Sequence, residues 1–364
     1  MSQPSPLLDL PPYPADGYKR LADRIGALLR TKNDVLLVQA EAIVALEAVA
    51  TSIASPAISA LNIVTSPYGA LFGDWLRRGD ARVADVTARP AKPIGVDQFA
   101  AALDAAPDVN LVSLVHAESA SGILNPLPEI ARLAKARGAV LVVDAVASFG
   151  GHQLDVDRLG VDIAVIGPQK ALSGSSGLSA VAVGAKAWQL IEQTRAPVQS
   201  TLSLVDLKRN WLDAGLGMLP GMPSALEFFA LEAALDRVEA EGLDAIVRRH
   251  RLAGAATRDA MRALGLSTWV ADASASDLVT ALTLPEGVET AELLRRANLA
   301  DADLTAGVGP GAESLLRLNH TGRRAQRQPV LANVAALAEA LRAIGIDTDL
   351  DAATTAIAAH YDAT

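Results

Sequence analysis

Apolar runs alternate with amphipathic stretches along the chain. The stretch 17–31 carries leucine and isoleucine at helical spacing and predicts an amphipathic helix. Two short apolar runs, 35–38 and 61–64, predict strands. Between them, the Ala-, Val- and Glu-rich stretch 41–54 predicts a second helix. The chain therefore begins with helices and strands in alternation.

The pattern becomes regular from about residue 109. Continuous apolar runs at 109–115, 139–143 and 161–166 predict three strands. A helix is predicted over 128–137, because proline stands at its start and glycine follows its end. Strands without polar alternation are buried on both faces and, where helices separate them, form parallel sheets. We therefore expect an α/β fold.

The second half of the chain predicts a different arrangement. The stretch 224–263 is rich in Ala, Leu, Glu and Arg and predicts one or two long helices. Strands are predicted at 266–270 and 279–284, followed by helices at about 289–297 and 329–343. These elements predict a smaller α+β domain.

We predict four segments from these patterns. They are an extended N-terminal segment (1–16), a large domain with a mostly parallel sheet sandwiched by helices (17–245), a small C-terminal α+β domain (246–346) and a loosely held tail (347–364). A chain of 364 residues is long enough to bury a sizeable core in each domain.

Composition narrows the function classes. Hydrophobic residues make up 51% of the chain and charged residues 20%, which excludes an intrinsically disordered protein. The formal net charge is −9 and no Lys/Arg block offsets it, so no nucleic-acid partner is expected. The absence of cysteine excludes thiolate metal sites and cysteine nucleophiles. The histidines show no metal-ligand spacing, so we assign no metal.

No segment has the pattern of a targeting signal or a membrane span. The first residues carry no positive region followed by an apolar run. The most apolar region, 35–64, is interrupted by Glu41, Glu47 and Pro56. We therefore expect no membrane partner and predict a cytoplasmic protein.

Asp144 and Lys170 are the strongest candidates for chemistry. Asp144 ends one buried apolar strand, and Lys170 follows the next after the turn 167–169. Open α/β sheets bind ligands at the carboxyl ends of their strands. Pyridoxal phosphate needs a lysine to form a Schiff base and a carboxylate to keep its pyridine nitrogen protonated. An Asp and a Lys alone would favour a capping aspartate and a solvated loop lysine. The two flanking strands, the Ser/Gly-rich loop after the lysine and, above all, a family resemblance favour pyridoxal 5′-phosphate as the cofactor.

The sequence resembles the class V aminotransferases over about residues 17–343. Its matching motifs are HAESASGILNP at 116–126, DAVAS at 144–148, QKAL at 169–172, GVGP at 307–310 and LRLNH at 316–320. These enzymes are fold-type I pyridoxal-phosphate transferases and include alanine–glyoxylate and serine–pyruvate aminotransferases. Within the family, the branch that transfers the amino group of pyridoxamine to pyruvate is the most similar. That similarity lies at 39–41, 66–69 and 203–206.

The resemblance implies a role for each matching residue. Lys170 would be the Schiff-base lysine and the proton carrier, and Asp144 would pair with the pyridine nitrogen. Tyr68 would stack on the ring, and Ser121 would hydrogen-bond near the ring hydroxyl. Arg317 would bind the substrate carboxylate through its guanidinium group.

Some of these residues also have structural alternatives. Tyr68 fits a half-buried core tyrosine, Ser121 a turn cap and Arg317 a structural ion pair. Gln169, which the resemblance places at the cofactor phosphate, also fits a polar loop residue. The sequence alone leaves these alternatives open.

The turn expected to hold the phosphate departs from the family pattern. The family has a small Ser-Gly-Thr-type turn here, whose donors suit a phosphate at a helix N-terminus. This chain has Gln39, Ala40, Glu41 and Ala42 instead, and a carboxylate repels a phosphate dianion. The pyridoxamine branch also carries glutamate at this turn, and its substrate has no phosphate.

Two further departures concern neighbouring loops. The segment 221–224 reads Gly-Met-Pro-Ser, without the threonine that the family often supplies to the phosphate of the neighbouring subunit. Val308 stands where the pyridoxamine branch has a carboxylate-binding arginine, so that Arg317 alone would hold the substrate carboxylate.

We therefore predict a pyridoxal-phosphate-dependent aminotransferase that moves an amino group from a small donor to pyruvate or glyoxylate through a Lys170 Schiff base. By analogy with the fold, it is expected to act as a homodimer. Three alternatives remain at this stage. They are an enzyme whose substrate is unphosphorylated pyridoxamine, a β-eliminating lyase of the same family, and a protein that keeps the fold for binding alone.

Overall fold

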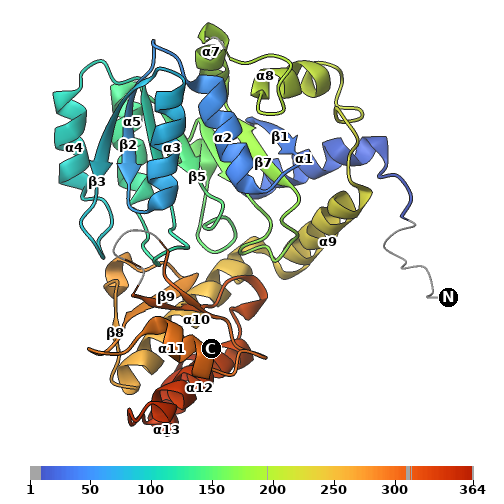
Figure 1. Ribbon diagram of the computed structural model, residues 1–364. Helices are drawn as coiled ribbons and strands as arrows, with labels where there is room; N and C mark the ends of the chain where they lie inside the picture. The colour runs from blue at the N-terminus through green and yellow to red at the C-terminus, as the bar shows by residue number, and fades with distance from the viewer. Residues whose placement is uncertain (1–9, 195, 309–311, 313, 363–364) are drawn as a thin grey trace.

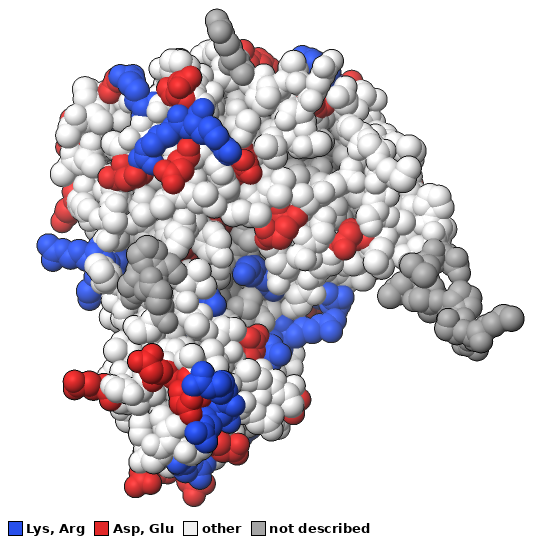
Figure 2. Space-filling model, in the orientation of Figure 1, with Lys and Arg blue, Asp and Glu red and all other residues white. Residues whose placement is uncertain are grey.

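The chain folds into a large α/β unit and a smaller α+β unit that lie one above the other in Figure 1. The computed structural model describes residues 10–194, 196–308, 312 and 314–362. Residues 1–9 of the predicted N-terminal segment, and the Gly-Pro pair 309–310 of the GVGP motif, lie outside these ranges. On the face shown in Figure 2, acidic and basic side chains are interspersed, without a broad basic surface among the described residues.

The large sheet has the strand order β1-β7-β6-β5-β4-β2-β3. Its strands are β1 (Asp34–Val38), β2 (Ser59–Val64), β3 (Arg82–Thr87), β4 (Leu111–Val115), β5 (Val140–Asp144), β6 (Ile163–Ile166) and β7 (Ser179–Val183). Strands β2 to β6 pair in parallel, whereas β7 runs antiparallel to both β6 and β1. Every residue of β4, β6 and β7 is buried, because helices flank the sheet on both sides. The prediction of an α/β fold with a mostly parallel sheet is confirmed.

The helices of the large unit follow the strands along the chain. They are α1 (Ala15–Leu29), α2 (Ala42–Ile53), α3 (Pro67–Arg78), α4 (Val96–Ala105), α5 (Leu127–Arg137), α6 (Val156–Leu159), α7 (Ala185–Gln193), α8 (Leu204–Leu207), a π-helical turn (Lys208–Leu212) and α9 (Ala225–Glu241). Helices α2 and α3 pack against each other and begin at the edge of the sheet where the parallel strands end. Their N-termini therefore lie beside the carboxyl ends of the parallel strands.

The small unit has a four-stranded antiparallel sheet in the order β10-β11-β9-β8. Its elements are α10 (Leu243–Ala263), β8 (Ser267–Thr268), β9 (Val279–Thr283), α11 (Thr290–Arg296), β10 (Leu304–Ala306), β11 (Leu316–Asn319), α12 (Arg327–Ala343) and α13 (Leu350–Tyr361), with short 3₁₀ turns at Asp272–Ser274 and Gly322–Arg324. The stretch 224–263 forms two helices, since Gly242 takes a positive φ of 86° between α9 and α10.

The core is divided into two main hydrophobic clusters that meet along α10. The cluster of the large unit extends to Ile246, and the cluster of the small unit begins at Ala253. One continuous helix thus contributes to both cores.

The C-terminal residues differ from the predicted loose tail. Residues 350–361 form α13, which packs on α10 and α12. Ala353 and Ile357 are fully buried there, and their i, i+4 spacing places both on one face of the helix. Asp349 caps the helix by accepting a hydrogen bond from the Ala352 amide at 2.8 Å. The small core thus continues to Tyr361, which packs against it.

Gly122 provides a test of how closely the two units approach. Its φ is 78°, and a Cβ atom built on it would lie 2.7 Å from the carbonyl oxygen of Val279 in β9. Gly138 has a similar φ of 75° but open space around it. Gly138→Ala is expected to cost about 1 kcal/mol of strain, and Gly122→Ala at least about 1–2 kcal/mol more, because backbone must also shift. Urea unfolding of both variants measures the difference, and equal losses would contradict the close approach.

Candidate active site

Most of the predicted site residues line one cavity of about 370 Å³ at the carboxyl end of the sheet. Lys170 and Asp144 lie in its wall, together with Tyr68 at the start of α3. Glu41 and Ala42, at the start of α2, complete the group. Residues that are distant in the sequence are therefore brought together, as the α/β pattern predicted.

The register of the sheet explains how Asp144 and Lys170 come close. Asp144 is the last residue of β5 and pairs with Val115 of β4 and Val165 of β6. Lys170 follows β6 by four residues, after a turn. Two parallel neighbours that end at one level thus deliver an acid and an amine to the same cavity wall.

Asp144 is held in position by the backbone. Its Oδ1 accepts a hydrogen bond from the Val146 amide at 2.9 Å. Burial raises the pKa of Asp144 to about 6, against the lowering effects of that hydrogen bond and of Lys170. A protonated pyridine nitrogen bound beside this carboxylate would oppose the effect of burial and favour the charged form.

Glu41 occupies the N-terminus of α2 with its own carboxylate. Its Oε2 accepts a hydrogen bond from the Ile43 amide at 2.8 Å. Its Oε1 accepts one from the Gln169 Nε2 atom at 2.6 Å. A helix N-terminus is a place where a phosphate binds readily. In this chain, the side chains of Glu41 and Gln169 bind each other at this position.

A second cleft of about 480 Å³ adjoins the first and shares Lys170 and Ser119 with it. Gln169 and Arg317 line this cleft. Arg317 lies in β11, where its Nε donates to the Ala306 carbonyl at 2.8 Å and its Nη1 to the Ser119 carbonyl at 2.5 Å. Arg317 forms no ion pair with the described residues, so nothing there supports the alternative of a structural salt bridge. Burial lowers its pKa.

Ser121 and Ser119 differ in their access to the cavity. Ser121 is buried and lines neither the cavity nor the cleft, whereas Ser119 lines both. The loop turns tightly, because the Gly122 amide donates to the Glu118 carbonyl at 2.8 Å. The motif at 116–122 located the loop correctly but did not show which of its polar residues face the cavity. Glu118 and Ser119 are the residues that sequence reasoning missed.

The site fits the ring of a vitamin B6 compound. Several buried polar atoms beside it have no hydrogen-bond partner within the described part of the chain, namely His116 Nδ1, Glu118 Oε2, Ser121 Oγ and Gln169 Oε1. Buried polar atoms normally find partners, so their presence here fits a polar ligand. Lys170, Asp144 and Tyr68 match an aldehyde, a pyridine nitrogen and a ring face. At the α2 N-terminus, where a phosphate would bind, the Glu41 carboxylate takes the Ile43 amide as a hydrogen-bond donor.

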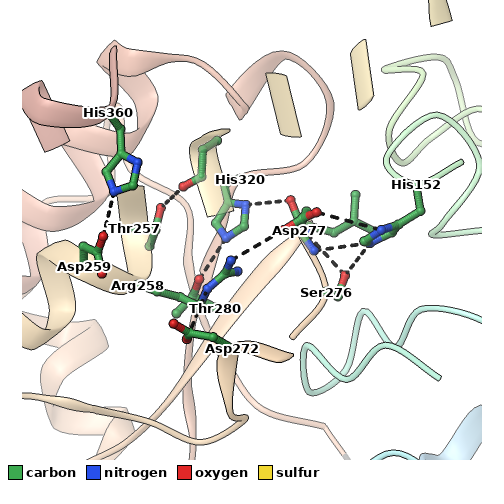
Figure 3. A network of polar contacts seen from close by, with 12 residues as sticks. His152, Thr257, Arg258, Asp259, Asp272, Ser276, Asp277, Thr280, His320 and His360 are labelled. Atoms are coloured by element: carbon green, nitrogen blue, oxygen red, sulfur yellow. Dashed lines mark hydrogen bonds and ion pairs between the residues drawn. The ribbon is translucent and has the colours of Figure 1, made fainter. Parts of the chain in front are cut away.

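A buried polar network joins the two units beside the site (Figure 3). His152, from the loop after β5, accepts a hydrogen bond from the Asp277 amide at 3.2 Å through Nε2. The Asp277 carboxylate lies 3.6 Å from Arg258 of α10. His320, which follows β11, contacts the Asp277 carbonyl through Nδ1 at 3.1 Å and Thr280 through Nε2 at 2.9 Å. This network holds β11, and with it Arg317, against the large unit.

Comparison with known proteins identifies the family. The class V aminotransferase family matches residues 22–309. A pyridoxamine–pyruvate transaminase of Mesorhizobium japonicum is 34% identical over 90% of this chain and 84% of its own length. An alanine–glyoxylate aminotransferase of Callithrix jacchus is 29% identical over 88% of this chain and 79% of its own.

Solved structures give the same result. A pyridoxamine–pyruvate aminotransferase of Mesorhizobium loti superimposes with a TM-score of 0.90 at 32% identity, covering 98% of this chain and 93% of that one. A ureidoglycine–glyoxylate aminotransferase of Bacillus subtilis, at 22% identity, shares the fold with a TM-score of 0.89 over 98% and 94% of the two chains.

The fold and the lysine–aspartate cavity define a fold-type I, pyridoxal-phosphate-dependent transferase. The chain belongs to the class V aminotransferase family, and it is an aminotransferase. The predicted fold, family and enzyme class are confirmed. Enzymes of this family depend on pyridoxal 5′-phosphate.

The described residues contain neither a membrane-spanning helix nor a cluster of metal-binding side chains. None of the helices in that part of the chain is long and apolar enough to cross a membrane. Nor do three or more His, Asp or Glu side chains gather there in a way that could hold a metal ion.

The buried histidines predict a measurable pH effect. Burial lowers the pKa of His152 to about 4, against about 6.5 in an unfolded chain. Below pH 6.5 the unfolded state therefore binds a proton that the folded state does not, and His152 destabilises the fold as the pH falls toward 4. Between pH 7 and pH 5, wild type should lose about 2 kcal/mol more than His152→Gln. Denaturant unfolding at both pH values measures this, and parallel losses would show that His152 titrates normally.

Proposed function

We propose that this aminotransferase passes an amino group to pyruvate or glyoxylate, with Lys170 as the residue that binds the cofactor aldehyde. The observation that supports this proposal is that Lys170 and Asp144 line one cavity, next to a cleft that contains Arg317. Pyridoxal phosphate, when bound, supplies an aldehyde that condenses with amines and a ring that takes up electrons.

Each residue has a task in this proposal. Asp144 binds the pyridine nitrogen and keeps its proton in place. Lys170, once its Nζ is released, moves a proton between the reacting carbons. Arg317 orients the carboxylate of the 2-oxo acid, because a guanidinium group binds a carboxylate through two hydrogen bonds. Its Nη1 and Nε are held by carbonyls, which fixes the plane of the group before substrate binds.

A second candidate concerns the amino donor, and Glu41 favours it. In this candidate the ring carries no phosphate, and pyridoxamine itself is the donor that reacts with the 2-oxo acid. The Glu41 carboxylate takes two hydrogen bonds at the α2 N-terminus, where a phosphate would otherwise bind. A neutral hydroxymethyl group beside Glu41 avoids the repulsion between two anions.

We also propose a homodimer. Met218 and Met222 are 67% and 95% exposed, although methionine is usually buried. They lie on the segment 213–224, which is tied to the site by a hydrogen bond of 3.0 Å from the Gln39 Nε2 atom to the Pro220 carbonyl. A second copy of the chain would cover these side chains. The cytoplasm remains the predicted compartment.

Replacement of Lys170 tests the central role. Wild type incubated with pyridoxal phosphate or pyridoxal should develop a visible absorbance band, and Lys170→Ala should not, because it lacks the amine. The variant should lose at least about a thousandfold in kcat with pyruvate as acceptor. Lys186→Ala, a lysine outside the cavity, is the matched control. A band that survives in Lys170→Ala would overturn the assignment, and turnover without any 2-oxo acid would point to elimination.

Replacement of Glu41 separates the two candidates. Glu41→Ser keeps a helix-capping oxygen but removes the carboxylate. If the ring is unphosphorylated, wild type should bind pyridoxal at least as tightly as pyridoxal phosphate, and Glu41→Ser should shift the ratio toward the phosphate about tenfold or more. Glu289→Ser, at the N-terminus of α11, makes the same change far from the site. Calorimetry gives both affinities, and a wild-type preference for the phosphate would leave the first candidate alone.

A further inference from the structure

The cavity contains a buried acid to which the roles above give no function. Glu118 has an exposed fraction of 0% and lines the cavity with Asp144 and Lys170. Its Oε1 accepts a hydrogen bond from the Thr65 hydroxyl. Its Oε2 finds no hydrogen-bond partner anywhere in the described ranges. A buried carboxyl oxygen without a partner is costly, so a ligand group that binds it would recover that cost.

The carboxyl group of Glu118 is held in one orientation. Thr65, which binds Oε1, in turn accepts a hydrogen bond from the Asn125 Nδ2 atom at 2.8 Å. The Asn125 amide also donates to the Val115 carbonyl at 2.8 Å and accepts from the Ile94 amide at 3.1 Å. The Glu118 amide donates to the Ile123 carbonyl at 2.8 Å. These contacts fix Oε1, and so leave Oε2 as the oxygen available to a ligand.

The strand order places Glu118 on a particular side of the cavity. In the sheet, β6 and β4 lie on opposite sides of β5, so that Lys170 and Glu118 follow strands on either side of Asp144. Glu41 and Gln169 bind each other on the β6 side. A vitamin B6 ring has its nitrogen opposite its reactive carbon, with the C5 arm on one side and the hydroxyl on the other. If the C5 arm of the ring points toward Glu41, the ring hydroxyl points toward the loop after β4, which carries Glu118.

We propose that Glu118 binds the ring hydroxyl of the B6 ligand through its Oε2 atom and thereby controls the protonation of that hydroxyl. One proton is shared in this contact: it lies either on the ring oxygen, which donates to the carboxylate, or on the carboxyl group, which donates to the ring oxygen. The inference rests on the proposed function, because it assumes a B6 ring oriented by Asp144 and Lys170.

The electrostatics of Glu118 agree with a shared proton. Burial raises the pKa of Glu118 to about 7, and the nearby Asp144 adds to this, against the lowering effects of the Ser66 and Thr65 hydroxyl groups. Lys170 and Glu41 are the other charged groups of the cavity wall. His116, on the same loop, is neutral at this pH, because burial lowers its pKa to about 3. Both protonation states of Glu118 are therefore accessible near neutral pH.

The test compares two ligands that cannot react with Lys170. They are 4-deoxypyridoxine, which keeps the ring hydroxyl, and the same pyridine without that hydroxyl. Wild type should bind the first at least about tenfold more tightly, since a buried hydrogen bond to a carboxyl group is worth that factor or more. Glu118→Leu should bind both with similar affinity. Calorimetry measures the four dissociation constants without reference to turnover.

Further variants keep the test independent of folding. Glu118→Gln retains the shape and the hydrogen bond but not the titration, so it should keep part of the preference. The absorbance of bound 4-deoxypyridoxine should change with pH near neutrality in wild type and not in Glu118→Gln. Glu129→Gln, an exposed glutamate of α5, is the matched control and should behave as wild type.

Two outcomes separate the inference from the function on which it rests. An equal preference for the hydroxyl in wild type, Glu118→Gln and Glu118→Leu would overturn the role of Glu118 and leave the proposed function intact. Failure of wild type to bind either ligand would overturn the proposed function itself.

Discussion

The parallel register of β4, β5 and β6 is the constraint on which the site depends. These strands are buried, and their side chains are almost all apolar, so they leave no room for polar chemistry between the helices. Polar side chains can therefore appear only where the strands end. Asp144 closes β5, and the loops after β4 and β6 contribute Glu118 and Lys170 at the same edge. A shift of one register position would turn Asp144 away from this wall.

The cavity is asymmetric in its charges, and the asymmetry indicates how a ring would lie. On the β6 side, both carboxylate oxygens of Glu41 accept hydrogen bonds, one from a backbone amide at the α2 N-terminus and one from Gln169. On the β4 side, the Glu118 Oε2 atom has no hydrogen-bond partner within the part of the chain that the structure describes. The carboxylate of Glu41 thus has its own partners, whereas that of Glu118 is available to a polar group of a ligand. The small unit completes the arrangement, because the network of His152, Asp277 and His320 fixes β11 beside the cavity.

Long apolar runs predicted the central strands well, since burial on both faces leaves a clear pattern. An apolar run does not show the direction of a strand or whether the strand lies at the edge of the sheet. The antiparallel course of β7 and the largely exposed edge strand β3 therefore escaped prediction. The sequence did not predict the helix α13 in the C-terminal segment, because the burial of Ala353 and Ile357 depends on contacts with helices that are distant in the sequence. In the site, the ends of the predicted strands were enough to predict the positions of Asp144 and Lys170. Which serine of the tight loop lines the cavity, Ser119 or Ser121, depends on the loop conformation, which the sequence pattern does not show.

Lys170 is the amine proposed to bind the B6 aldehyde, and the proposed function depends on it. The most direct measurement is to incubate wild type with pyridoxal phosphate and, separately, with pyridoxal, reduce each sample with borohydride, and map the modified lysine by peptide mass spectrometry. Reduction makes the lysine adduct permanent, so its position is read without reference to turnover. We predict a single adduct, on Lys170, with at least one of the two compounds. Adducts spread over exposed lysines, or none on Lys170 with either compound, would contradict it.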